Sequence, residues 1–295
     1  MPVSGNTPAL NWRAFFIYAV LGVATANAGP SPGAGQATTY AQLGKPDQEE
    51  GRQVLAAFRR AGIPGQYYLQ FVLRVLPRRG DERDFSGSLW GARNEQGAVT
   101  RVAVTDAAGG ERRLLVQNGE HPQVWSVAAG QSASSPQAVD AFAPLIPGVE
   151  LTAFELQMTY LYWPDATLEQ VSRIRSRPAH VFFFKPPVAW AADHPGVSGV
   201  RAYLDTQYNV PVQTELIGRD GKVLRTLSLV DLAKVGEQYI PKTVDLRNEA
   251  TRDKTRFQVT GAALGLEFSS IVFEPAQLTE PVTPPAKDKI VEIAP

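Results

Sequence analysis

The feature that most constrains the fold of this chain is an alternation of apolar and polar residues that recurs along its length. Between residues 67 and 75, for example, apolar Leu69 and Phe71 flank polar Gln70. Alternation with a period of two is typical of a strand with one buried face. Short turn sequences such as Asp220-Gly221 separate the alternating segments. Sequential strands joined by short turns pair as an antiparallel meander, so the chain is expected to form a large sheet.

The same pattern predicts the positions of the strands. They are expected at residues 67–75, 84–92, 98–105, 111–117, 123–127, 172–184, 200–208, 212–217, 222–229, 242–246, 254–260 and 268–273. A sheet of this size must curl, close or split to protect its edges. We therefore expect a mainly β (α+β) fold in which helices cover the concave face of a strongly curved antiparallel sheet.

Two segments have the spacing of helices. Asp47 can cap a helix that has one apolar face and ends near Gly62. A second helical segment runs from Leu151 to Tyr162 and ends at Pro164. Its apolar residues lie almost all round, so protein or ligand must cover it.

Composition excludes several classes of function. The chain has 25 glycines, 23 prolines and 44% apolar residues, which favours a turn-rich β protein with a sizeable core. It contains no cysteine, which excludes disulfides, thiolate metal sites, cysteine nucleophiles and a lipoprotein lipidation site. Lys plus Arg equals Asp plus Glu, at 29 each, so no basic surface indicates a nucleic-acid partner.

The first residues have the pattern of a secretory signal peptide. Arg13 precedes the apolar run Ala14–Ala26, and Ala26-Asn27-Ala28 has the small residues of a cleavage site. We expect a signal peptide over residues 1–28, cleavage after Ala28 and a periplasmic location. An uncleaved membrane anchor is the alternative.

The remaining chain is expected to form one domain. Residues 29–46 are predicted to be a flexible lead-in, and residues 47–278 a single folded domain. The Pro-rich residues 279–295 are predicted to be a disordered tail.

No motif for catalysis stands out. His121, His180 and His194 have no partner at metal-ligand spacing, and the chain has no Gly-x-Ser-x-Gly motif. We expect no enzyme activity, no metal and no cofactor. A secreted β-rich hydrolase stays open as an alternative, because a carboxylate pair formed in the fold would not show in linear spacing.

Large apolar side chains exceed what a sheet with one buried face needs. The alternative to an ordinary core is that they line an apolar cavity, in which a methionine could reshape around a variable ligand. The candidate cavity residues are Phe71, Trp90, Phe154, Met158, Tyr162, Phe182, Phe184 and Tyr203.

Four stretches of the second half resemble a known family, the LolA-like outer-membrane lipoprotein-sorting proteins. The stretches are GVELTAFELQMTYLYWPDA, VSRIRSRPAHVFFFKPP, RAYLDTQYNVPVQTELIGRDGKVLRTLSL and YIPKTVDLRNEATRDKTRFQVTGAALGLEFSSIVFEPAQL. They run from Gly148 to Leu278. This pattern of strands and turns carries no catalytic motif.

The resemblance implies an unclosed antiparallel β-barrel with helices over a hydrophobic cavity. It also implies a periplasmic chaperone for lipoprotein transport, which shields the acyl chains of a lipoprotein or lipid on the way to the outer membrane. The implied partners are an inner-membrane ABC-type release complex and an outer-membrane acceptor. A binding module that senses lipid or lipoprotein and signals to a membrane partner is the alternative.

Overall fold

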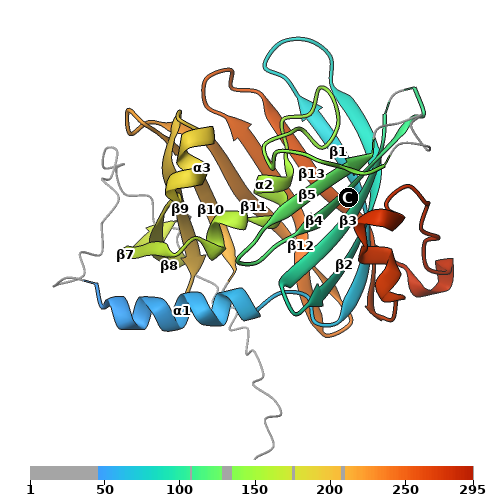
Figure 1. The fold of residues 1–295 in the computed structure, drawn as a ribbon, viewed down its shortest axis with the longest axis horizontal. Coiled ribbons are helices and arrows are strands. Elements are labelled where there is room, and N and C mark those ends of the chain that lie inside the picture. The colour runs from blue at the N-terminus through green and yellow to red at the C-terminus, as the bar shows by residue number, and fades with distance from the viewer. Residues whose placement is uncertain (1–45, 107, 128–134, 175–176, 207–209, 295) are drawn as a thin grey trace, which may run out of the picture. The chain divides into compact units, whose positions relative to one another are not determined.

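The predicted strands form one antiparallel sheet in the computed structural model of this chain, which describes residues 46–106, 108–127, 135–174, 177–206 and 210–294. Within these residues, fourteen strands pair in the order β6-β5-β4-β3-β2-β1-β13-β12-β11-β10-β9-β8-β7, and β14 pairs with β13 off this path (Figure 1). Their bounds are β1 Gln66–Leu76, β2 Arg83–Asn94, β3 Gly97–Thr105, β4 Glu111–Gln117, β5 Gln123–Val127, β6 Gln137–Ala138, β7 Asp165–Ile174, β8 Arg177–Lys185, β9 Val197–Asp205, β10 Pro211–Gly218, β11 Val223–Val235, β12 Gln238–Asn248, β13 Lys254–Leu266 and β14 Val291–Glu292.

The sheet consists of two meanders joined at their inner strands. The first runs from β1 to β6, the second from β7 to β13, and β1 pairs with β13 along its whole length. Strands β6 and β7 are the two ends of this order, so the curved sheet stays unclosed. The predicted unclosed, antiparallel architecture is confirmed.

The three α-helices and the first 3₁₀ helix lie on the concave side of the sheet, and the other 3₁₀ helices belong to the C-terminal part of the chain (Figure 1). The α-helices are α1 Gln48–Arg60, α2 Ala153–Gln157 and α3 Val188–Asp193, and the 3₁₀ helices are η1 Thr159–Tyr162, η2 Ser270–Phe273, η3 Pro275–Gln277 and η4 Lys287–Lys289. Helix α1 begins as predicted, because the Asp47 carboxylate accepts the backbone N–H groups of Glu49 and Glu50.

Two contacts fix α1 against the edge strand β7. The Gln48 side-chain amide bonds both the N–H and the C=O of Leu168, as a neighbouring strand would. Gly51 brings the helix close, since a Cβ there would lie 3.0 Å from the Leu168 Cβ. Helix α1 therefore protects part of an edge that would otherwise be free for pairing.

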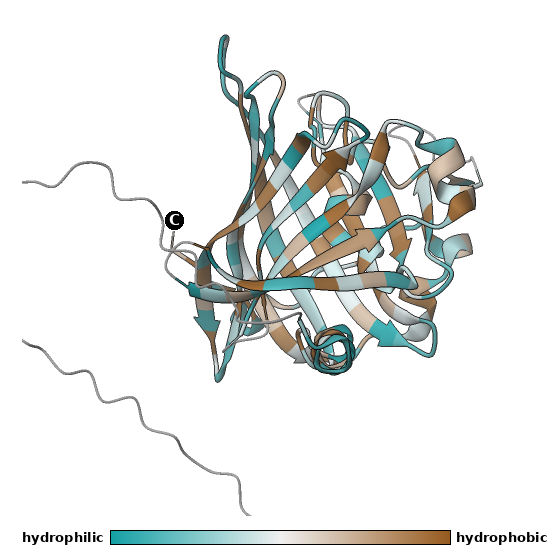
Figure 2. Cartoon of the chain, turned by 90° about the vertical axis from the view of Figure 1, so that its left-hand side faces the viewer, coloured by the Kyte–Doolittle hydropathy of each residue, from teal (hydrophilic) through white to brown (hydrophobic). Residues whose placement is uncertain are grey.

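Hydrophobic and hydrophilic residues alternate along the strands (Figure 2), and the buried hydrophobic residues form a core on the concave face. A central cluster gathers buried residues of both meanders, including Leu69, Phe71, Leu227, Phe257 and Val259. An aromatic cluster lies beside it, between the second meander and the helices, and comprises Phe142, Phe154, Tyr160, Trp163, Phe182, Phe184 and Trp190.

Residues 267–294, the C-terminal segment, pack on the opposite, outer face of the sheet (Figure 1). Phe268, Phe273 and Ile290 of this segment contact Tyr68 and Trp90. The prediction of a disordered tail is therefore wrong for residues 279–294. Proline content suggested disorder, but the segment has enough apolar residues to bury against an apolar sheet face.

Buried Arg101 of β3 holds the C-terminal segment in place. Its side chain is 2% exposed and donates to the carbonyl oxygens of Val272, Gln277 and Leu278 at 3.0–3.3 Å, and to that of Glu280. Burial, with a contribution from neighbouring Arg113, lowers the pKa of Arg101 to about 10. The guanidinium thus remains charged at neutral pH.

Three predicted elements differ from the structure. The prediction of one strand over residues 172–184 is wrong, because β7 and β8 form a hairpin there that no Gly or Asn signals. The strand predicted over residues 268–273 is replaced by η2. The helix predicted over residues 151–162 is divided into α2 and η1.

No helix within the described part of the chain is long and apolar enough to cross a membrane. The predicted signal peptide, residues 1–28, lies outside the described residues.

The ion pairs of Asp245 are expected to make the free energy of unfolding depend on pH. Its carboxylate bonds Arg256 at 2.7 Å and 2.9 Å and Lys254 at 3.2 Å. Burial opposes ionisation, but these cations outweigh it and hold the pKa of Asp245 below its ordinary value. The stabilisation is therefore present above the unfolded pKa of about 3.9 and is lost as pH falls through the folded pKa. Asp245→Asn is expected to lower the free energy of unfolding by about 2 kcal/mol at pH 7.

Urea unfolding of both proteins from pH 7 to pH 2.5 would check this. The difference between them should shrink steadily below about pH 4. A difference that is the same at every pH would show that the Asp245 charge does not matter.

Candidate functional site

A cavity of about 160 Å³ lies between α2 and the concave face of the sheet. Strands of both meanders and the segment from α2 to Met158 enclose it. Its lining is mainly apolar and consists of Ile63, Tyr67, Leu69, Leu89, Leu151, Glu155, Leu156, Gln157, Met158, Leu227, Pro241, Val244 and Phe257. Such a lining binds apolar groups and supplies few polar groups for chemistry.

The helical wall of this cavity is interrupted at Met158. Helix α2 ends there because Met158 adopts the left-handed conformation, with φ 50° and ψ 52°, which is uncommon for a residue other than glycine. Helix η1 begins at the next residue. The break places a flexible thioether side chain at the cavity wall and divides the cover into two short helices that can shift separately.

An ion pair connects helix α2 to the sheet. Glu155 of α2 is 6% exposed, and its carboxylate accepts a 2.9 Å hydrogen bond from Arg225 of β11. The same carboxylate accepts the Thr152 N–H at 3.2 Å and the Thr152 hydroxyl, which completes a capping box at the start of α2. The buried charge is therefore fully bonded, and α2 is attached to the sheet at its first turn.

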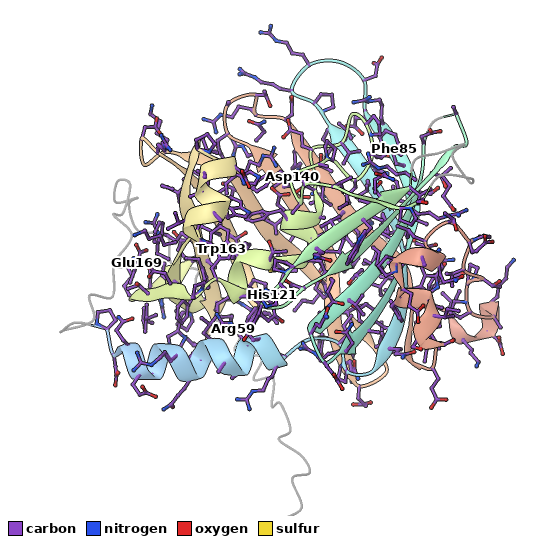
Figure 3. All side chains as sticks on the ribbon, viewed as in Figure 1. Arg59, Phe85, His121, Asp140, Trp163 and Glu169 are labelled. Atoms are coloured by element: carbon purple, nitrogen blue, oxygen red, sulfur yellow. The ribbon has the colours of Figure 1, made fainter. Side chains whose placement is uncertain are left out.

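The aromatic cluster meets the cavity at Met158, which packs against the cluster and also lines the cavity. The Phe154 ring makes several of the ring contacts in this cluster. This ring stacks on Phe142 at a centroid distance of 4.3 Å and on Trp190 of α3 at 5.8 Å. Arg59 of α1 donates to the carbonyl oxygens of Leu161 at 2.6 Å and Trp163 at 3.4 Å (Figure 3). Helix α1 therefore contacts η1 and Trp163, whereas α2 and α3 meet through the Phe154–Trp190 stack.

The structure brings most of the predicted cavity residues to the concave side. Met158 lines the cavity, and Phe71 belongs to the central cluster. Phe154, Phe182 and Phe184 belong to the aromatic cluster, and Tyr162 packs against it. Their direct contact with a ligand stays a prediction.

Two predicted residues face the other way. Trp90 contacts Tyr68 beneath the C-terminal segment, because the alternation of β2 points its neighbour Leu89 into the cavity instead. Tyr203 donates to Glu215 at 3.4 Å on the outer face of β9, and burial together with this carboxylate raises its pKa to about 12. For Trp90 and Tyr203 the cavity prediction is wrong.

Sequence reasoning missed most of the cavity lining. Leu227, Val244 and Phe257 line it, yet each has the ordinary appearance of an alternating core position, and Leu156 lies in the helical segment. The available signal was the alternation itself, which places consecutive strand residues on opposite faces of the sheet. If each strand residue had been assigned to the inner or the outer face, Trp90 would have been excluded from the predicted cavity lining and Leu89 included in it.

The histidines are separated in the fold. His194 bonds the Asp140 carboxylate at 3.0 Å and stacks on Trp190, whereas His180 Nε2 lies 3.8 Å from Glu50. Within the described ranges, no group of three or more His, Cys, Asp or Glu residues is arranged to hold a metal ion.

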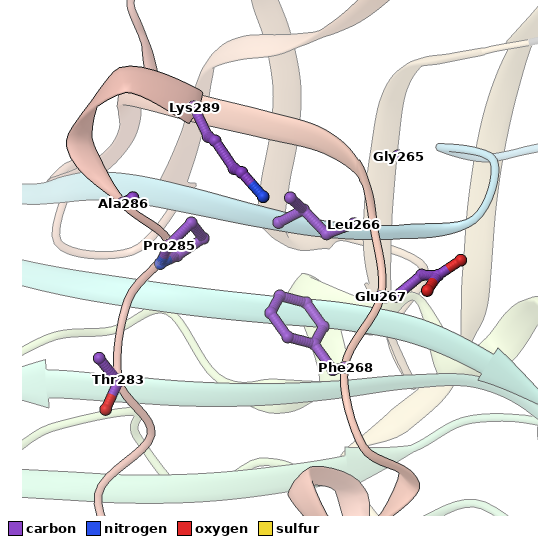
Figure 4. Close-up of a pocket in the computed structure, with 8 residues that line it drawn as sticks. All are labelled: Gly265, Leu266, Glu267, Phe268, Thr283, Pro285, Ala286 and Lys289. Atoms are coloured by element: carbon purple, nitrogen blue, oxygen red, sulfur yellow. The ribbon is translucent and has the colours of Figure 1, made fainter.

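A second hollow, of about 510 Å³, lies on the outer side where the C-terminal segment arches over the end of β13 (Figure 4). Glu267 and Lys289 are among its lining residues. Its charged lining makes it less suited to an apolar group than the inner cavity is.

The fold is similar to three solved structures, one of which is described as a LolA superfamily protein. A DUF1329 family protein from Desulfovibrio piger is 11% identical, with a TM-score of 0.65 over 78% of this chain and 98% of that one. A putative outer membrane lipoprotein-sorting protein domain from Vibrio parahaemolyticus is 12% identical, with a TM-score of 0.64 over 78% and 97%. A LolA superfamily protein from Nitrosomonas europaea is 12% identical, with a TM-score of 0.60 over 76% and 96%.

These matches define the class of protein by its fold. The chain has a LolA-like fold, and the resemblance predicted from the sequence is confirmed at this level. A sequence-family model described as "Uncharacterized protein" matches residues 191–280, which include β9 to β13. No curated protein matches the chain.

Proposed function

We propose that this protein is a periplasmic, non-enzymatic carrier that shields acyl chains of a lipid or lipoprotein in the cavity under α2. The observation that supports this most directly is the apolar cavity, lined by α2 and by the concave face of the sheet. Each methylene kept from water contributes about 0.8 kcal/mol, so a soluble carrier has to cover the whole chain.

The cavity must enlarge to hold a long chain. Its volume of about 160 Å³ is close to that of an engineered cavity of roughly 150 Å³ that binds benzene. Pockets for larger ligands have roughly 300–1,000 Å³. The break at Met158 allows α2 to move outward without breaking a long helix, once the Glu155–Arg225 ion pair and the hydrogen bonds of Gln157 with Thr100 and Asn118 are released. Adjacent apolar surface of the aromatic cluster would then join the cavity.

The carrier is proposed to receive its cargo at an inner-membrane release complex and to deliver it to an outer-membrane acceptor. Binding and delivery need only opening and closing of the cover, so no reaction is required.

Native mass spectrometry and a fluorescence assay would test the proposal. The purified protein is expected to retain lipid after export, and the delipidated protein to bind cis-parinaric acid with a micromolar or lower dissociation constant. A protein that retains no lipid and binds no parinaric acid would contradict the proposal. Crosslinking in the periplasm that recovers a transmembrane regulator, with no transfer of cargo, would instead indicate a sensor.

A further inference from the structure

The pairing between β12 and β13 stops halfway along both strands. It extends from Arg247↔Lys254 to Thr243↔Gln258. Beyond this point, in the fully described stretch 238–266, the first residues of β12 pair only with β11 and the last residues of β13 pair with β1. A gap therefore opens in the sheet between residues 238–242 of β12 and residues 259–266 of β13.

Strand β14 occupies the β13 side of this gap. Val291 pairs with Ala262, Glu292 pairs with Gly261, and the Ile293 N–H donates to the Thr260 carbonyl oxygen at 2.9 Å. The strand thus supplies the backbone partners that β12 does not supply there.

The residues on either side of β14 reach both faces of the sheet. Ile290 packs with Trp90 and Tyr68 on the outer face, whereas Ile293 packs against the central cluster on the inner face. The end of the C-terminal segment therefore enters the gap rather than lying over the sheet.

The gap borders the cavity. Pro241, in the part of β12 that does not pair with β13, lines the cavity from one side. Leu69 lines it from the other side and pairs with Ala262, which is also the partner of Val291. One strand, β13, separates β14 from a cavity-lining residue of β1.

We propose that the gap between β12 and β13 is a lateral entrance to the cavity, closed by β14, through which an acyl chain enters or leaves. This inference rests on the proposed carrier function and makes the gap the main route of the acyl chain, whereas movement of α2 enlarges the cavity. Strand β14 spans two residues, so its release costs little compared with opening of the sheet. Arg101 keeps residues 272–280 attached meanwhile, because its four carbonyl partners precede β14 in the chain.

A disulfide that locks β14 would test the entrance. The chain has no cysteine, so Ala262→Cys with Val291→Cys introduces a single pair at directly opposite positions. Oxidation is expected to slow association and dissociation of cis-parinaric acid by at least tenfold, and reduction with dithiothreitol to restore both rates. Equal rates in the oxidised and reduced protein would overturn the proposal.

A second measurement does not depend on lipid binding. Leu69→Cys places a thiol in the cavity wall, and deletion of residues 290–295 should raise its reaction rate with N-ethylmaleimide by at least tenfold. The control is Val102→Cys, a buried position of the central cluster outside the cavity lining, whose rate should not change. No increase at Leu69→Cys, or the same increase at both positions, would refute an entrance at the gap. If the protein binds no parinaric acid, the carrier function fails, whereas the labelling still decides whether β14 closes the cavity.

Discussion

Replacement of Arg101 by alanine is expected to lower the free energy of unfolding by about 3–5 kcal/mol, because each buried acceptor left without a donor costs about 1–3 kcal/mol. The guanidinium is 2% exposed and satisfies four carbonyl oxygens of the C-terminal segment. Alanine would leave these acceptors without a donor and create a void beneath the segment. Urea unfolding followed by circular dichroism would measure the loss.

The region that loses protection shows whether Arg101 stabilises the C-terminal segment or the protein as a whole. Hydrogen exchange should increase first in residues 270–280, while the paired residues of β8 and β9 stay protected. Arg101→Lys should recover only part of the stability, because an ammonium group cannot replace the planar fork of five donors. Arg74→Ala, which removes a half-exposed ion pair with Asp84, is the matched control and should cost less than about 1 kcal/mol. Equal losses for Arg101→Ala and Arg74→Ala would contradict this account.

Most strands of the two meanders could be predicted from the sequence, because strand alternation and turn residues are local signals. Asp220-Gly221 at the β10–β11 turn and the phase of β1 were both readable from neighbouring residues. The pairing of β1 with β13 joins segments far apart in the chain, and no local pattern specifies it. The same holds for Arg101, whose partners follow it by more than 170 positions.

The cavity could be predicted only in outline. An excess of aromatic residues indicated an apolar lining, and Met158 does lie in it. Trp90 was wrongly predicted to line the cavity because its size was considered without asking which face of β2 it occupies. The outer face of the sheet was also expected to be exposed to water. Once the C-terminal segment covers that face, a strand can bury large residues on both sides. A covering segment that is itself irregular leaves no periodic signal by which to predict it.

Filling the cavity is expected to reduce lipid binding without unfolding the protein. Val244 of β12 lines the cavity and is half-buried, so a larger side chain has space on the cavity side. Val244→Trp keeps an aromatic residue in a strand, where such residues are favoured. If the indole displaces about three methylenes of the ligand at about 0.8 kcal/mol each, affinity for cis-parinaric acid should fall about 50-fold.

A variant with a tryptophan on the outer face of the sheet is the control, because it separates loss of cavity volume from a general effect of the added side chain. Val230 is 47% exposed and does not line the cavity, so Val230→Trp adds the same side chain without occupying the ligand volume. Both variants should unfold cooperatively, with melting temperatures close to that of the parent protein. Only Val244→Trp should lose affinity in a fluorescence titration. Unchanged affinity in a folded Val244→Trp protein would mean that acyl chains bind elsewhere, because a ligand that occupies this cavity cannot share its volume with the indole ring.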